Sequence, residues 1–445
     1  MAFFSDPAFW TVSLFIALLA LRVPIAVCIG MASIAVAWFW DLGLPMISYN
    51  FFANIAKYPL LAIPYFILAG NIMSQAGIAA RIITFIRLLF GHLTGGLAIA
   101  TVIVAAFWGA VSGSPAATVA ALGVILIPAM VAQGYPVKFG TGVIATSGGL
   151  GILIPPSIVM VMYAVATSGM VVTGPDGGPI MSASIGTLFM AGVIPGLMLA
   201  TMLGATTTYR AWKNDYPRMP RASWRERWRA FRESVWGLML IVIIMGGIYG
   251  GIFTPTEAAA VSAVYAFVIA VWVYKDIRLR EVPKVLLTSA AMSAMLLYII
   301  TNAVMFAFIL TSEQIPQAVS AWIVDMGLGK IGFLMAVNII LLVIGMVMEP
   351  SAIILIMAPI LFPVAMKLGV DPVHFGIMLV VNMEVGLCTP PVGLNLYVAS
   401  SLSKLGLTDV TKATWPWLLT ALIFLMLVTY IPDISLFLPR LLGMM

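Results

Sequence analysis

The feature that most constrains this chain is a succession of long apolar stretches separated by short polar breaks. A bilayer core is about 30 Å thick, and a helix that crosses it needs roughly 20 apolar residues. Only 9% of the 445 residues are charged and the mean hydropathy is +1.12, so most of the chain faces lipid rather than water. The sequence therefore predicts an all-α polytopic membrane protein. The apolar stretches lie at residues 8–21, 24–40, 59–77, 97–132, 139–170, 185–209, 234–252, 255–274, 285–312, 331–368, 373–402 and 413–438.

Two of the stretches are too long for one crossing and carry a polar turn at their centre. The stretch 97–132 is interrupted by Ser112-Gly113-Ser114-Pro115, and the stretch 331–368 by Glu349-Pro350-Ser351. Each is long enough for two half-crossings that enter and leave by the same face. We therefore expect two re-entrant hairpins.

Two further stretches, 139–170 and 373–402, are each interrupted by a pair of prolines, Pro155-Pro156 and Pro390-Pro391. Proline lacks a backbone donor and disfavours helix in the residue before it, so both helices must unwind at mid-membrane. Unwound backbone at that depth is tolerated only where protein or a water-filled cavity satisfies it. The sequence thus predicts two broken helices.

Backbone-breaking residues recur at a nearly fixed distance along the chain, which predicts an internal repeat over 1–210 and 234–445. Because the first hairpin enters from the cytoplasm and the second from outside, we expect the repeats to be inverted, an arrangement typical of transporters. A spacing of 235 residues separates Pro115, Pro128, Gly134, Gly151, Pro155 and Pro156 from Pro350, Pro363, Gly369, Gly386, Pro390 and Pro391. A spacing of 236 relates Pro136, Phe139 and Gly140 to Pro372, Phe375 and Gly376, and 231 relates Pro24 to Pro255.

The segment 209–233 is the one strongly polar part of the chain, and 211–233 is the expected cytoplasmic connector between the repeats. Aromatic residues recur in it at helical spacing, so we expect an amphipathic helix lying on an anionic lipid surface. The competing interpretation of a basic run is a nucleic-acid binding site. The position of this segment between membrane spans disfavours that interpretation. Its basic residues are Arg210, Lys213, Arg218, Arg221, Arg225, Arg227, Arg229 and Arg232.

The distribution of basic residues predicts the orientation of the chain. With 209–233 in the cytoplasm and both hairpins re-entrant, 18 of the 22 Lys and Arg residues fall on the cytoplasmic side. Only Lys57, Lys330, Lys367 and Arg440 then lie outside. Both termini are therefore predicted to be periplasmic.

Composition also argues against several function classes. Two cysteines and two histidines, far apart in sequence, do not suggest a zinc or haem site, and no Walker A loop for ATP is present. Glu349 and Glu384 are the acidic residues well within the apolar stretches, and no His, Cys or Asp accompanies either at a catalytic spacing. An intramembrane enzyme is therefore not expected. A structural scaffold would have no use for paired proline breaks.

Five stretches resemble one family closely, the large membrane subunit of the tripartite ATP-independent periplasmic (TRAP) transporters, and the likeness covers nearly the whole chain. One departure from the family pattern is Glu349, where Asp is frequent. The stretches are SGSPAATVAALGVILIPAM (112–130), GLGILIPPSIVM (149–160), GIFTPTEAAA (251–260), MEPSAIILIMAPILFPVA (348–365) and NMEVGLCTPPVGLNLYVA (382–399).

The resemblance implies a sodium-coupled secondary transporter of the ion-transporter superfamily, with an elevator-type mechanism, in the bacterial inner membrane. It implies uptake of a small organic acid, such as a C4-dicarboxylate, and two partners: a small four-helix membrane subunit and a periplasmic substrate-binding protein. The alternative within transport is a stand-alone sodium/carboxylate symporter of the same superfamily, which needs no binding protein.

Na⁺ prefers hard oxygen ligands, and unwound helices offer free carbonyls beside hydroxyls. We expect one sodium site where the first hairpin tip faces the first broken helix, and a symmetric second site. The competing interpretation of Ser and Gly at these places is close helix packing. The predicted ligands are Ser112, Gly113, Ser114, Thr146, Gly149 and Gly151 in the first site, and Glu349, Pro350, Ser351, Gly386, Thr389 and Pro390 in the second.

The substrate is expected between the two tips, where half-helix N-termini present unpaired amides suited to a carboxylate. An intramembrane carboxylate is costly, so Glu384 is a functional hypothesis, although a protonated structural Glu beside a broken helix is the alternative. Asn395 either donates to substrate or satisfies freed carbonyls. The predicted substrate residues are Ser114, Thr118, Pro155, Pro156, Ser157, Glu384 and Asn395.

Overall fold

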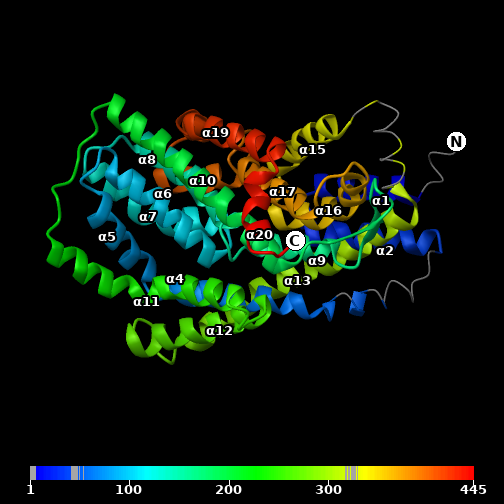
Figure 1. Cartoon of the computed structure of the whole chain (residues 1–445), viewed down its shortest axis with the longest axis horizontal. Coiled ribbons are helices and arrows are strands. Elements are labelled where there is room, and N and C mark those ends of the chain that lie inside the picture. The colour runs from blue at the N-terminus through cyan, green and yellow to red at the C-terminus, as the bar shows by residue number, and fades with distance from the viewer. Residues whose placement is uncertain are drawn as a thin grey trace.

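The computed structural model describes residues 7–41, 49, 51–53, 55–315, 318, 321, 327 and 329–445, and in these residues it is almost entirely helical (Figure 1). The first half contains α1 (Pro7–Ala20), α2 (Ile25–Phe39), η2 (Tyr58–Leu61), α4 (Ala62–Gln75), α5 (Ile78–Phe90), α6 (Gly96–Ser112), α7 (Pro115–Ala132), α8 (Val137–Ser147), η3 (Gly148–Ile152), α9 (Ile158–Thr167), β1 (Val171–Thr173), β2 (Pro179–Met181) and α10 (Ile185–Lys213). The second half contains α11 (Trp224–Tyr249), α12 (Pro255–Val268), η4 (Ile269–Val273), α13 (Val282–Ser312), α15 (Lys330–Gly345), α16 (Pro350–Lys367), α17 (Pro372–Leu387), α18 (Leu394–Ser403), α19 (Leu407–Tyr430) and α20 (Asp433–Leu441).

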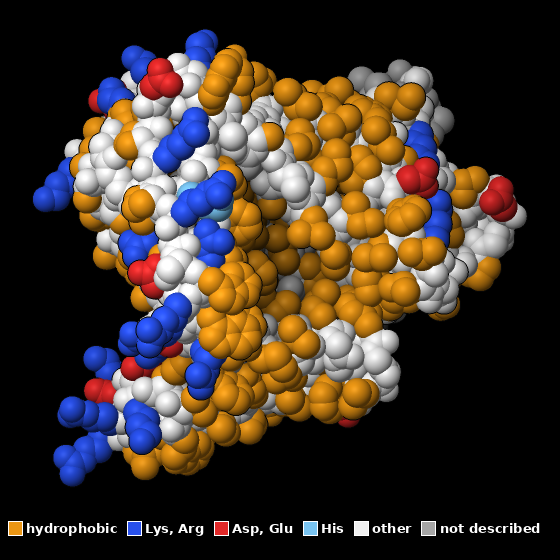
Figure 2. Space-filling view, turned by 60° about the vertical axis from the view of Figure 1, so that its left-hand side comes forward, with side chains coloured by type: hydrophobic (Ala, Val, Ile, Leu, Met, Phe, Trp, Pro, Cys, Tyr) orange, Lys and Arg blue, Asp and Glu red, His pale blue; other side chains and the backbone are white. Residues whose placement is uncertain are grey.

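The predicted multi-span helical architecture is confirmed. Within the described residues, seven helices are long and apolar enough to cross a membrane: α7, α10, α11, α12 with η4, α13, α16 and α19. The pair formed by η2–α4 and α5 passes the same test as one span bent by 69°. Figure 2 shows a broad apolar band, with Lys and Arg gathered along one end of the molecule. This is the surface of a protein that lipid surrounds.

The two long stretches with a central polar turn each form a pair of helices joined by a short turn. The first pair is α6 and α7, separated by Gly113 and Ser114, and the second is α15 and α16, separated by residues 346–349. Proline at the first position of α7 and α16 costs no hydrogen bond, because the first amides of a helix have no partner within it. The stretches with paired prolines are interrupted as expected, between η3 and α9 and between α17 and α18. Both Pro–Pro peptide bonds are cis.

Elements of the two halves pack on one another in reciprocal pairs. Helix α2 packs on α13 and α4 on α12, while α7 packs on α18 and α16 on α9. A third pair is α8 on α19 and α10 on α17. Each of these elements has a counterpart in the other half, about 235 residues away in sequence. When both elements of one contact are replaced by their counterparts, the result is the other contact of the pair.

The single amphipathic helix predicted over 209–233 is wrong. Helix α10 continues to Lys213, residues 214–223 are not helical, and α11 begins at Trp224 and runs on into the apolar stretch. Pro217 and Pro220 explain the interruption, because neither can donate a helical hydrogen bond. The start of α11 is fixed by a capping box in which Ser223 and Glu226 satisfy each other's amides.

Two features were not expected from the sequence. Helix α5 lies outside the predicted apolar stretches, because Arg81 and Arg87 interrupt its apolar sequence. The strands β1 and β2 form a short antiparallel pair with Val171 opposite Met181. This pair follows the first broken helix and lies in the segment that joins it to α10.

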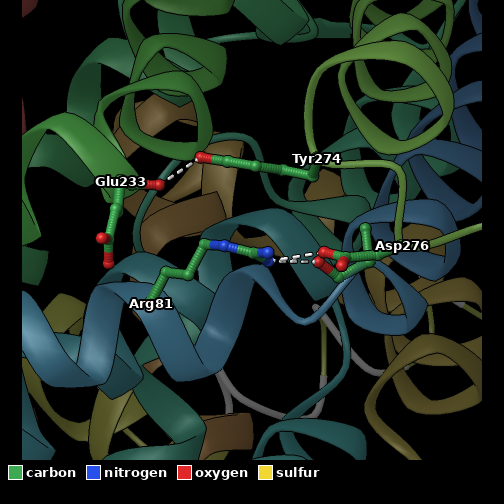
Figure 3. Close-up of polar contacts among 5 residues, drawn as sticks. Arg81, Glu233, Tyr274 and Asp276 are labelled. Carbon is green, nitrogen blue, oxygen red and sulfur yellow. Dashed lines mark hydrogen bonds and ion pairs between the residues drawn. The ribbon is translucent and has the colours of Figure 1, made fainter.

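Arg81 connects α5 to the elements around η4 (Figure 3). Its guanidinium forms an ion pair of 2.6 Å with Asp276 and lies 4.1 Å from the centre of the Tyr274 ring. The Tyr274 hydroxyl donates a hydrogen bond of 2.6 Å to the Glu233 carbonyl of α11. These contacts join α5, α11 and the end of η4, and they involve none of the predicted site residues.

Candidate functional site

The tip of the first hairpin gathers several oxygen atoms. Gly113 has φ +64°, a left-handed conformation that glycine adopts without steric cost, and it turns the chain from α6 into α7. The hydroxyls of Ser112 and Thr118 lie 2.8 Å apart, and Thr118 also donates to the Ser114 carbonyl at 2.9 Å. Ser114 caps α7 by accepting from the Ala117 amide. The residues predicted at this tip are therefore in mutual contact.

This tip lies against the first broken helix. A Cβ on Gly113 would meet the Ile158 side chain at 2.6 Å, and one on Gly148 would meet the Pro115 carbonyl at 3.3 Å. Below the tip the two backbones touch at Gly109 and Gly151, where a Cβ on Gly151 would come within 2.7 Å of the Gly109 carbonyl oxygen. The glycines bring the hairpin and the break into direct backbone contact.

The other residues predicted along the first break form hydrogen bonds mainly with backbone groups close to them in sequence. The Thr146 hydroxyl donates to the Gly142 carbonyl at 3.0 Å within its own helix. Ser157 caps α9, accepting from the Met160 amide and donating to the Ile152 carbonyl. Pro155 and Pro156 lie in the non-helical segment between η3 and α9. Carbonyls in that segment lack helical partners, so they are the oxygens available to an ion.

The tip of the second hairpin carries different chemistry. Glu349 caps α16 with its carboxylate, which accepts from the Ser351 hydroxyl at 2.7 Å and the Ser351 amide at 3.0 Å. It also lies 3.4 Å from the Ala352 amide. Pro350 follows as the first residue of the helix. The Glu349 oxygens are therefore already engaged in capping, with the Ser351 amide and hydroxyl as their donors.

The second break contacts the second hairpin as the first break contacts the first. A Cβ on Gly386 would meet the Gly345 Cα at 3.0 Å, the counterpart of the contact between Gly151 and Gly109. The Gly393 amide donates to the Met346 carbonyl at 2.9 Å and so joins the unwound segment to the end of α15. The Thr389 hydroxyl donates to the Val385 carbonyl, and Pro390 lies in the segment between α17 and α18.

The two broken helices meet at a buried polar cluster formed by Glu384, Cys388, Asn395 and the Ala145 carbonyl. Asn395 Nδ2 and Cys388 Sγ each donate to that carbonyl at 3.2 Å. Glu384 packs on Gly149, where an added Cβ would come within 3.1 Å of Glu384 Oε1. All three side chains are at most 3% exposed. Within the described residues, Glu384 Oε2 and Asn395 Oδ1 have no hydrogen-bond partner.

Cys388 and the Ala145 carbonyl were not predicted as parts of this cluster. Cys388 follows the last residue of α17, one turn after Glu384, and Ala145 of α8 lies one turn before Gly149 of η3. Their contact depends on how two remote helices cross, for which the sequence offers only the matched breaks as a signal. Ser147 also has a buried hydroxyl without a partner among the described residues.

A second polar network on α17 was missed by sequence reasoning. In this network the His374 ring places Nδ1 2.9 Å from the Ser435 hydroxyl and Nε2 3.3 Å from the Thr429 carbonyl. Asn382 donates to Asn338 Oδ1 at 2.9 Å, and Asn338 donates to the Thr429 hydroxyl at 2.8 Å. These bonds join α15, α17, α19 and α20, which is a packing role. Among the described residues no group of three His, Cys, Asp or Glu side chains is arranged to hold a metal ion.

Comparisons with known proteins agree on one family. The family described as "Tripartite ATP-independent periplasmic transporter, DctM component" matches residues 12–434. A Rhodobacter capsulatus protein named C4-dicarboxylate TRAP transporter large permease protein DctM is 62% identical over 97% of this chain and 98% of its own length. Proteins of the same name from Pseudomonas aeruginosa and Vibrio cholerae are 50% and 44% identical, over 89% and 96% of this chain and 90% and 96% of their own lengths.

A solved structure shares the fold. The YdaH transporter of Alcanivorax borkumensis superposes with a TM-score of 0.62 over 86% of each chain, at 14% sequence identity. At that identity the likeness concerns the arrangement of helices alone. It agrees with the multi-span helical architecture described above.

Proposed function

The chain belongs to the DctM-component family of tripartite ATP-independent periplasmic transporters, and on that premise we propose that it carries a C4-dicarboxylate or a similar small carboxylate into the cell. As a large permease of this family it is a multi-pass membrane transport protein of a bacterial secondary transporter, and not an enzyme. The substrate class is supported by three relatives at 44–62% identity over most of their lengths, each named for C4-dicarboxylate.

The observation that carries the proposal is the reciprocal packing of the two halves around two broken helices. Each hairpin contacts its own break through a pair of glycines, Gly109 with Gly151 and Gly345 with Gly386. The second arms of the hairpins, α7 and α16, pack across on α18 and α9. This exchange is what inverted repeats produce. It supports an elevator-type movement in which hairpins and broken helices travel together.

Sodium is the proposed coupling ion, with one site at each tip. At the first tip Ser112, Thr118 and the Ser114 carbonyl already lie within hydrogen-bond distance of one another, so a small movement would turn their oxygens toward one cation. The unwound backbone around Gly149 and Gly151 would supply carbonyls. At the second tip the carbonyls around Gly386, Thr389 and Pro390 take that role, because Glu349 is occupied as a cap.

The carboxylate substrate is proposed to bind between the tips, near the starts of α7 and α9. There Ser114 and Ser157 each cap one amide, and the other amides of the first turn have no partner within the helix. Ionised Glu384 would repel such an anion, so we assign it a cation-holding role rather than direct substrate contact. It is 2% exposed, and one of its oxygens lacks a partner among the described residues. A buried carboxylate in that state is stable only when a proton or metal cation accompanies it.

The family also implies partners, which we propose to be a small four-helix membrane subunit and a soluble periplasmic binding protein that delivers the substrate. The proposed orientation in the bacterial inner membrane places the basic end of the molecule in the cytoplasm and both termini in the periplasm. The apolar band and the concentration of Lys and Arg at one end support this orientation.

Uptake of labelled succinate into proteoliposomes tests the proposal. The chain, its small subunit and the loaded binding protein should together accumulate succinate only when an inward sodium gradient is applied. Ser114→Ala should raise the sodium concentration for half-maximal uptake, because it removes a tip hydroxyl. Ser312→Ala is the control, since that exposed hydroxyl bonds its own helix away from the tips.

Three results would contradict parts of the proposal. Full uptake with potassium or protons alone would exclude sodium as the coupling ion. Equal sodium dependence in Ser114→Ala and Ser312→Ala would exclude the first tip as an ion site. Equal rates with and without the binding protein would favour a stand-alone carrier.

A further inference from the structure

Two cavities meet at Lys57, near the strands β1 and β2 and Met444, next to the last residue of the chain. The larger, of about 550 Å³, is lined by Lys57, Tyr58 and Met444 and by five Ser and Thr residues: Ser168, Ser182, Ser184, Thr254 and Thr256. The smaller, of about 200 Å³, shares Lys57, Val165 and Ser168 with the first and extends to Thr311. The larger volume lies within the roughly 300–1,000 Å³ typical of small-molecule sites. We call this pair the Lys57 cavities.

The Lys57 cavities have the chemistry of an anion site. Neither is lined by an Asp or Glu side chain, and in the described part of the chain no carboxylate forms an ion pair with Lys57. The nearby Glu257 is turned onto the Thr254 amide and hydroxyl, at 2.8 and 2.9 Å. Half-burial lowers the pKa of the Lys57 ammonium through lost hydration. A bound anion would offset that loss.

The walls of the cavities come from two different groups of elements. One wall is formed by residues beside η2, by residues 254–256 at the start of α12, and by α13. The other group comprises the end of α9, residues 182–186 and α16. Helices α9 and α16 belong to the broken helices and hairpins, whereas α12 and α13 pack on α4 and α2. The cavities therefore lie on the seam between the part proposed to move and the part proposed to stay.

We propose that Lys57 and the surrounding hydroxyls form a receiving site for a carboxylate anion, which the substrate occupies before it reaches the hairpin tips. The proposal rests on the carboxylate uptake proposed above and adds a separate location to it. At the tips the carboxylate is met by amides and hydroxyls, so Lys57 supplies the cationic side chain that those positions lack. A partly hydrated ammonium attracts an anion but binds it weakly, so a site of this kind would release the substrate again.

Protection of a cysteine from labelling tests the site directly. Ser168 is exposed and lines both cavities, while the native Cys28 and Cys388 are buried and serve as an unreactive background. In the Ser168→Cys chain reconstituted without sodium and without binding protein, succinate should slow reaction with a membrane-impermeant maleimide. The neutral analogue succinamide should not. Adding Lys57→Gln should raise the succinate concentration needed for protection about tenfold, as expected for one lost hydrogen bond between charged groups.

A matched control is Lys367→Gln, which removes a positive charge from the end of α16 without touching either cavity. It should leave protection unchanged, and Lys57→Arg should retain most of it. In uptake assays Lys57→Gln should raise the apparent KM for loaded binding protein while kcat changes little.

Equal protection in Lys57→Gln and in the parent chain would overturn the receiving site, and so would equal protection by succinamide. Absence of protection in a chain that still takes up succinate would overturn it as well. Protection that persists in a chain with no uptake would instead refute the proposed function and leave the anion site standing.

Discussion

Substitution of Gly151 by alanine tests whether the first hairpin and the first break are held together by direct backbone contact. The new Cβ would lie 2.7 Å from the Gly109 carbonyl oxygen and closer still to the Gly109 Cα. Because these are backbone atoms, no side chain can rotate away, and either α6 or η3 must move. Overpacking of this kind costs about 1–3 kcal/mol, and we expect the upper part of that range.

Two other glycines serve as comparisons for this prediction, one at the repeat-related position and one with no close neighbours. At Gly386 the Cβ would meet the Gly345 Cα at 3.0 Å, which a shift of a few tenths of an ångström relieves. At Gly204 in α10 nothing lies within 4 Å, and alanine there should stabilise the helix by about 0.5–1 kcal/mol. The expected order of destabilisation is therefore Gly151→Ala, then Gly386→Ala, with Gly204→Ala neutral or stabilising.

The measurement is thermal unfolding of the detergent-solubilised chain, followed by size-exclusion recovery after heating, with succinate uptake in parallel. Gly151→Ala should lower both the unfolding temperature and the uptake rate. Gly109→Ala should behave in the same way, because its Cβ would meet the Gly151 amide nitrogen at 2.7 Å. An unfolding temperature for Gly151→Ala equal to that of Gly204→Ala would refute the close backbone contact, and with it the argument for why glycine is needed there.

Three further predictions concern orientation, the buried carboxylate and the corner of Figure 3. Ser223→Cys and Asp176→Cys, both at exposed positions, should react with an impermeant reagent from opposite sides of the membrane; reaction from the same side would refute the proposed orientation. Glu384→Gln should fold normally but lose coupled uptake, since glutamine keeps the shape of a protonated glutamate and cannot release its proton or hold a cation; unchanged uptake would make Glu384 structural. Arg81→Ala should lower stability by about 1 kcal/mol through loss of the Asp276 ion pair and the ring contact while leaving uptake unchanged, and a change in sodium dependence would contradict its placement away from the site.

The hairpins and breaks could be predicted from the sequence because their signals are local. Proline removes a donor wherever it stands, and Gly113 or Pro115 in an apolar stretch implies a turn without knowledge of any neighbour. Helix α5 was missed for the opposite reason. Arg81 and Arg87 interrupt its apolar sequence, and the bend that joins it to α4 as one span is visible only in the structure. There α5 packs against α11 and is tied to Asp276 by an ion pair.

The buried cluster around Glu384 could be predicted only in part. A carboxylate in the middle of an apolar stretch is a local signal, and it indicated Glu384 correctly as a buried polar residue. Its partners depend on the crossing of α8 and α17, elements more than two hundred residues apart in sequence. The hydrogen bonds of Cys388 and Asn395 to the Ala145 carbonyl have no sequence signature. The same holds for the Lys57 cavities, whose lining residues come from segments far apart in sequence, from Lys57 to Met444.

The two hairpin tips repeat the same backbone breaks but differ in charge, and this difference bears on how coupling would work. The Ser114 hydroxyl caps α7 at 3.4 Å from the Ala117 amide, a weak contact that leaves the oxygen free to turn toward an ion. The Glu349 carboxylate caps α16 through contacts of 2.7 and 3.0 Å to Ser351, so a cation must compete with bound donors for its oxygens. An ion at the second tip would therefore be attracted by a nearby negative charge without full direct ligation. The first tip has no such charge and depends on several neutral oxygens closing together. If each tip holds a sodium ion as proposed, this difference in chemistry predicts two sites of unequal affinity, with closure of the first tip responding most to sodium.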